Sequence, residues 1–113
     1  MIKCVCIDDK SRPSKIPESK WITKDVEYTL AFAVVVLPQR ELAFQLQEID
    51  LDESCSPFTY FLANRFAFRE EDLMKLNSFI QECTSINISI KELTKKLNLN
   101  EGATDTSQKN QGT

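Results

Sequence analysis

The residue types that carry most enzyme chemistry are sparse in this chain. It contains no histidine, and histidine is the commonest general acid–base residue and a frequent metal ligand. Ser54 and Ser56 have no base at an identifiable spacing, which disfavours nucleophilic catalysis. The two glycines are Gly102 and Gly112, so glycine-dependent phosphate cradles are excluded. We therefore predict that the protein is not an enzyme.

Two groups of carboxylates could in principle bind a divalent metal ion. Asp8 and Asp9 open a polar loop, where such a pair usually forms a solvated turn. Asp50, Asp52 and Glu53 alternate as in a calcium loop, but they lack the glycine and the terminal glutamate of an EF-hand. We expect neither group to bind a metal, and the sequence predicts no cofactor.

Four cysteines are the remaining candidates for metal or redox chemistry, and they are Cys4, Cys6, Cys55 and Cys83. Their spacing lacks the close C-x-x-C pairs of a zinc site, and no histidine can complete one. We expect reduced and mostly buried thiols. The alternative is a metal or redox site that Cys4 and Cys6 form with a third thiolate from Cys55 or Cys83.

Aromatic side chains beside the predicted loops are the best candidates for ligand binding. In small β-barrels, loop aromatics often form a groove that docks peptides or stacks bases. The aromatics in question are Trp21, Tyr28, Phe58, Tyr60 and Phe61, and Lys20 and Arg65 could frame the groove. We take as candidate binding residues Trp21, Lys20, Phe58, Tyr60 and Arg65. The alternative is that the aromatics complete a small core.

These residues must be positioned by strands that pair with the longest apolar run, Glu27–Leu37. Its alternation and its β-branched and aromatic residues favour a central strand over a helix. At about eleven residues the run is long for one strand, so a bulge is expected near Ala31–Ala33. Shorter strands are predicted over Ile2–Ile7, Leu42–Leu46 and Arg65–Phe68.

After Arg69 the apolar residues recur with the period of a helix. Leu73, Leu76 and Ile80 follow one another at three- and four-residue spacing. The acidic residues just before them complement the positive end of a helix dipole. The sequence therefore predicts an amphipathic helix with one apolar face.

A second, shorter helix is predicted over Ile90–Leu97. Ser89 and Glu92 match a capping box, in which each side chain bonds the other residue's backbone N–H. The isoleucines of residues 86–90 also alternate as they would in a strand. We favour the helix, entered through an extended segment.

Because the strands precede the helices, we predict an α+β fold with segregated layers. Residues 1–69 would form a small, bent, antiparallel SH3-like β-barrel of about five strands. Residues 70–97 would form a helical segment packed on the barrel, and the polar residues 98–113 a disordered tail. A homodimer through the helical segment is the alternative use of its apolar face.

The net charge of −3 combines a basic N-terminal region with an acidic block at residues 25–53. Overall acidity argues against tight, sequence-independent binding of duplex nucleic acid. No apolar run approaches the roughly 20 residues that span a bilayer, and the N-terminus does not resemble a signal peptide. We expect a cytoplasmic protein without a membrane partner.

One pattern of residues resembles a known family. It consists of Cys6–Lys10, Pro17, Ser19–Trp21 and Tyr28, followed by Glu48–Leu51, Pro57–Phe61 and Arg65–Phe66. The pattern is similar to that of small bacterial proteins often associated with phages or mobile elements, and it covers about residues 3–68. That family has no established activity, so the resemblance implies a small β-barrel and no functional residues. Asp25 stands where the family tends to have glycine.

For function, we predict a non-catalytic binding or accessory module that recognises a protein partner through its loops or its helical face. The alternative is a nucleic-acid-associated module with a local basic and aromatic patch. That patch would consist of Lys10, Arg12, Lys15, Lys20 and Trp21. A steep loss of binding with added salt would favour the alternative.

Overall fold

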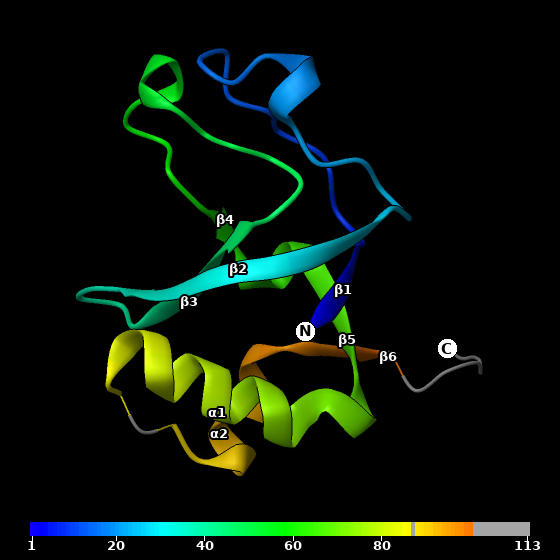
Figure 1. Ribbon diagram of the computed structural model, residues 1–113, viewed down its shortest axis with the longest axis vertical. Coiled ribbons are helices and arrows are strands. Elements are labelled where there is room, and N and C mark those ends of the chain that lie inside the picture. The colour runs from blue at the N-terminus through cyan, green and yellow to red at the C-terminus, as the bar shows by residue number, and fades with distance from the viewer. Residues whose placement is uncertain (87, 101–113) are drawn as a thin grey trace.

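The computed structural model describes residues 1–86 and 88–100. It contains a six-stranded sheet in the order β4-β3-β2-β1-β5-β6. The strands are β1 (Lys3–Cys6), β2 (Glu27–Val36), β3 (Glu41–Leu46), β4 (Phe61–Leu62), β5 (Phe66–Arg69) and β6 (Asn98–Asn100). The α-helices are α1 (Leu73–Thr84) and α2 (Ile90–Lys96), and short 3-10 turns are η1 (Glu18–Lys20), η2 (Glu53–Cys55), η3 (Ala63–Arg65) and η4 (Glu70–Asp72). Both α-helices lie on one side of the sheet, and the two longest loops lie at the opposite end (Figure 1).

β2 is the central strand, as predicted. Its first part pairs with β1, where Tyr28 lies opposite Cys4, and its longer second part pairs with β3. The register shifts between Leu30 and Phe32, which confirms the predicted bulge. Beyond the bulge Ala33 is fully buried, whereas Phe32 is 42% exposed. The bulge therefore sets which side chains of the second half face the core.

Thr29, just before the bulge, is a buried polar residue whose hydrogen bonds are satisfied. Its backbone N–H donates to Glu48 Oε1 over 2.8 Å, and its hydroxyl accepts a bond from Lys3 Nζ over 3.0 Å. Its carbonyl accepts a third bond, from the N–H of Gln47. Burial raises the pKa of Glu48, but the hydrogen bonds from Thr29 outweigh it and lower that pKa overall. The junction between the two halves of β2 is thus held by side chains from two other segments.

The sheet is open in the part of the chain that the structure describes. β4 and β6 lie at its two edges, and the pairs formed among β1–β5 are all antiparallel. The predicted α+β class and the order of sheet before helix are correct, whereas the SH3-like barrel is not confirmed. A physical reason is the length of β4, whose two residues offer little hydrogen-bonding edge for closure.

β6 corrects the predicted boundary of the tail. Asn98–Asn100 pair in parallel with β5, where Ala67 lies opposite Asn98, so the prediction of disorder was wrong for these residues. Their composition was misleading because an edge strand needs only backbone hydrogen bonds, and the preceding Leu97 is buried in the core. The rest of the predicted tail, residues 101–113, lies outside the described residues.

The helical segment follows the sequence prediction closely. Leu76 and Ile80 of α1 are fully buried against the sheet. Ser89 caps α2, since its hydroxyl accepts a hydrogen bond from the N–H of Glu92 over 3.1 Å. Residues 85, 86, 88 and 89 belong to no strand, and residue 87 lies outside the described residues. No described helix has the length and apolarity that crossing a membrane requires.

We predict that Ile80→Ala lowers the free energy of unfolding by about 2–5 kcal/mol, because it leaves a cavity beneath the sheet. Urea denaturation followed by circular dichroism measures the change. The matched control is Met74→Ala in the same helix, where the side chain is 69% exposed and the change should stay within about 0.5 kcal/mol. Equal effects of the two substitutions would contradict the packing described above.

Candidate functional site

Four of the five predicted binding residues line one groove at the loop end of the sheet. Trp21, Phe58, Tyr60 and Arg65 all contribute to it, and its volume is about 480 Å³. The fifth, Lys20, does not line the groove. Four residues that the sequence analysis assigned to one candidate binding site therefore lie together in the fold.

Two loops supply opposite parts of the groove lining. The β1–β2 loop contributes Pro13, Ile16 and Trp21. The segment before β4 contributes residues 57, 58 and 60, and β4 contributes both of its residues. Arg65 of η3, Val36 of β2 and Glu41 of β3 also line the groove. These loops emerge at the same end of the sheet (Figure 1), since β1 precedes the start of β2 and the end of β3 pairs with that region.

Trp21 is anchored by the chain itself. Its indole Nε1 donates a hydrogen bond to the backbone oxygen of Asp9 over 2.6 Å. Its ring lies 5.6 Å from the ring of Phe61, centroid to centroid, and the Arg65 guanidinium carbon lies 5.0 Å from its centroid. The polar end of the indole and one face are therefore engaged internally, which leaves part of the ring to line the groove.

Arg65 is likewise committed to the fold. Its Nη1 donates to the carbonyl oxygens of Lys10 over 2.8 Å and Asp8 over 3.3 Å, and it lies 3.6 Å from Asp8 Oδ1. The side chain is 19% exposed. A guanidinium with these partners and with Trp21 beneath it acts as a clamp on the β1–β2 loop, and it presents little free charge to a ligand.

Lys20 ties the two long loops to each other. Its Nζ lies 2.5 Å from Asp52 Oδ2. The hydrogen bond with Asp52 raises the pKa of Lys20. Bonds from Lys20 and Ser54 in turn lower the pKa of Asp52 to about 2. Asp52 also caps η2 by accepting the N–H of Ser54, so Lys20 has a structural role that the sequence prediction missed.

Phe58 and Tyr60 are the aromatic side chains left available for a ligand. Phe58 is 37% exposed and Tyr60 is half-buried. Within the described residues neither side chain forms a ring contact or a hydrogen bond. Tyr28 and Phe61, by contrast, are buried in the core. The aromatics are thus divided between core packing and the groove.

Several groove residues were not among the sequence candidates. Pro13 and Pro57 contribute flat apolar surface, and Leu62 lies on the same side of β4 as Tyr60. Ile16 is buried and also lines the groove. The alternation of Tyr60 and Leu62 indicates that the two side chains share one face. Pro13 is far from these residues in the sequence, so no local pattern linked it to them.

The thiols follow the expectation of free and mostly buried side chains. Cys4, Cys6 and Cys55 are buried and Cys83 is partly buried, and all are free. Burial raises the pKa of Cys4 to about 12, with smaller contributions from nearby carboxylates. Such a thiol stays protonated at neutral pH and is a poor nucleophile and ligand.

The predicted carboxylate groups hold loop structure. Asp8 Oδ1 accepts the N–H of Lys10 over 3.0 Å, and Asp9 Oδ2 accepts the N–H of Lys24 over 2.9 Å. Among the described residues no three cysteine or acidic side chains gather as metal ligands would. These carboxylates stabilise turns of the β1–β2 loop.

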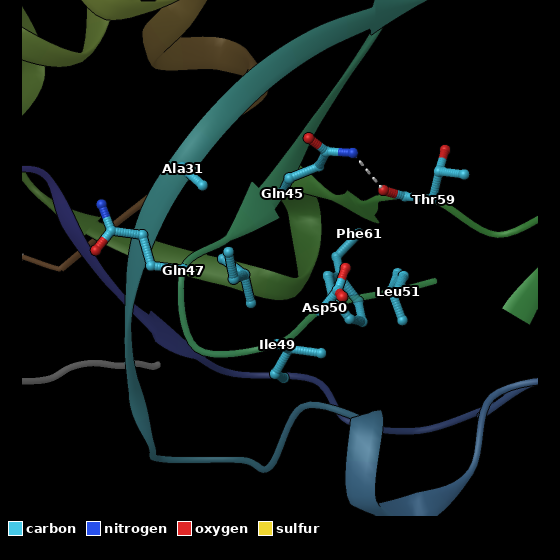
Figure 2. A pocket seen from close by; sticks show the side chains of 9 residues that line it. Ala31, Gln45, Gln47, Ile49, Asp50, Leu51, Thr59 and Phe61 are labelled. Atoms are coloured by element: carbon cyan, nitrogen blue, oxygen red, sulfur yellow. Dashed lines mark hydrogen bonds between the residues drawn. The ribbon is translucent and has the colours of Figure 1, made fainter. Parts of the chain in front are cut away.

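Figure 2 shows a second hollow, of about 340 Å³. Phe61 lines both this hollow and the groove. Gln45 of β3 and Gln47 contribute amides, and the segment after them contributes Asp50. Gln45 Nε2 donates to the carbonyl oxygen of Thr59 over 3.0 Å, which is the bond drawn in Figure 2. The hollow therefore has both polar and apolar residues in its lining.

No protein-family model, curated protein or solved structure matches this chain. The resemblance to small bacterial proteins of phages and mobile elements therefore stays a prediction. The function must be argued from the geometry of the groove and the hollow.

We predict that Trp21→Phe lowers the free energy of unfolding by about 1 kcal/mol, because the carbonyl of Asp9 loses its donor. The control is Tyr60→Phe, which removes a hydroxyl without a hydrogen bond to the described residues and should change stability by less than about 0.5 kcal/mol. Urea denaturation compares the two. A larger loss of unfolding free energy for Tyr60→Phe than for Trp21→Phe would contradict the conclusion that Trp21 is anchored and Tyr60 is not.

We predict that the pKa of Asp52 is about 2 in the folded protein and rises in Lys20→Met. The folded pKa lies below the unfolded value of about 3.9, so the linked stabilisation is present above about pH 4 and is lost as the pH falls through about 2. Carboxyl carbon NMR measures the titration. Lys24→Met is the control. An Asp52 pKa that does not change in Lys20→Met would contradict the ion pair between Lys20 and Asp52.

Proposed function

We propose that the protein is a non-catalytic module that docks an extended segment of a partner protein in the groove. The observation that carries this proposal is the exposure of Phe58 and Tyr60 in a hollow flanked by Pro13 and Pro57. Unpartnered aromatic surface next to proline rings is typical of grooves that receive extended, apolar peptide segments. Aromatic anchors also contribute most of the binding energy at protein interfaces.

The position of β4 supports an extended partner. β4 is an edge strand and contributes Phe61 and Leu62 to the groove lining. An extended segment in the groove can therefore lie along a strand edge and pack its side chains against the rings. A volume of about 480 Å³ is enough for a few side chains.

The helical face is a weaker candidate surface than the groove. Leu76 and Ile80 of α1 are buried within the chain, which leaves little of the apolar face for a second copy. The SH3-like barrel stays a prediction, and the docking proposal depends on the groove rather than on closure of the sheet. We place the module in the cytoplasm, which its free thiols favour.

The nucleic-acid alternative has less support, because much of its basic patch is engaged. Lys20 is paired with Asp52, and Arg12 Nη1 donates to the carbonyl oxygen of Ile16 over 2.5 Å. The ring of Trp21 is partly covered by Arg65. Phosphate contacts need free cations, and the net charge of the chain is −3.

We predict that panning a random peptide library against the full chain enriches peptides that bind at the groove. Phe58→Ala and Tyr60→Ala, tested separately, should each weaken such a peptide about tenfold, or about 1.4 kcal/mol, because each removes an anchoring ring. Fluorescence anisotropy measures the affinity, and circular dichroism verifies folding of each variant. Phe32→Ala is the matched control, an exposed aromatic outside the groove lining.

Two outcomes would overturn the proposal. One is that no peptide is enriched, or that enriched peptides bind both groove variants as tightly as the parent chain. The other is that single-stranded oligonucleotides bind with a steep salt dependence while peptides do not, which would favour the nucleic-acid function.

A further inference from the structure

We propose that the docked segment carries a basic side chain, lysine or arginine, that enters the second hollow (Figure 2). This inference rests on the proposed docking function and names the chemistry of the partner. Phe61 of β4 lines both hollows. The proposed segment contacts Phe58 and Tyr60 and places one side chain beyond Phe61, in the second hollow.

The hollow offers acceptors for a cationic head group. Asp50 supplies a carboxylate and forms no salt bridge with the described residues. The amide of Gln45 donates its N–H to Thr59, which leaves its oxygen to accept a bond. Gln47 also lines the hollow. An ammonium or guanidinium group has only donors, so it matches this set of acceptors.

The apolar part of the hollow suits the stem of the same side chain. Ile49, Leu51 and Phe61 line it together with the polar groups. Lysine and arginine bury their methylene stems on apolar surface while their charged heads stay among polar groups. A short acidic or amide side chain would leave this apolar surface uncovered.

The charge around the hollow also selects a cation. The chain places four carboxylates at residues 48–53, namely Glu48, Asp50, Asp52 and Glu53, with no lysine or arginine among them. Lys20 reaches this block, where it pairs with Asp52 and also interacts electrostatically with Asp50. The remaining negative charge attracts a basic residue and repels an acidic one.

The test uses the peptides selected on the full chain. We expect lysine or arginine to be enriched at a fixed distance from the apolar residues. Replacing that residue by glutamine should weaken binding about tenfold, and Asp50→Asn should weaken the parent peptide by the same factor. The glutamine peptide should not respond to Asp50→Asn, since the interaction is already lost. Glu53→Gln is the control, an exposed acid of the same loop outside the hollow.

The outcomes separate this inference from the docking function. Peptides that respond to Phe58→Ala and Tyr60→Ala, but show neither a basic residue nor a response to Asp50→Asn, would overturn the inference and leave the docking function intact. If no peptide binds, docking fails, and the hollow is tested directly with Nα-acetyl-arginine and Nα-acetyl-lysine methylamides. NMR shifts at Gln45, Gln47 and Thr59 that vanish in Asp50→Asn would support a basic-side-chain site, and their absence would exclude it.

Discussion

The architecture depends on the way β2 divides its hydrogen bonds between two neighbours. Its first residues bond to β1 and its later ones to β3, and the bulge after Leu30 lets one strand serve both. The junction buries Thr29, whose backbone and hydroxyl bonds come from Glu48 and Lys3. Without those partners a buried polar residue would destabilise the junction. Because β1 and β3 both end near the start of β2, the long loops that follow them lie together there (Figure 1).

Those loops have little regular structure, and specific side chains hold them. Arg65 bonds the carbonyls of the β1–β2 loop and lies over Trp21, and Lys20 joins that loop to Asp52 of the other. The described residues contain no glycine, and φ is positive at residues such as Asp25, where glycine would be the usual choice. The groove lies between these two loops. Its shape therefore depends on the contacts of Arg65 and on the ion pair between Lys20 and Asp52.

The sequence predicted those features that depend on local patterns. The alternation in β2 placed the central strand and its bulge, and the spacing of Leu76 and Ile80 placed α1 with its buried face. Closure of the sheet and the pairing of β6 depend on backbone bonds between distant segments, for which side-chain patterns carry little information. The same holds for the site: residue type identified Trp21 and Tyr60 as candidates, but only the contacts of Trp21 with Asp9 and Phe61 separate the anchored ring from the available one.

The uneven charge of the chain bears on the orientation in which the proposed segment would dock. The β1–β2 loop that forms one wall carries Lys10 and Lys15, while the segment beside the second hollow carries Asp50 and Glu53. The Lys20–Asp52 pair neutralises part of this difference where the loops meet, and Glu41 adds a carboxylate to the lining of the groove. A uniformly apolar groove would accept an extended segment in either orientation. For the proposed docked segment, the carboxylate of Asp50 would favour the orientation that brings a basic residue to it. Complementary charge of this kind contributes more to specificity than to affinity.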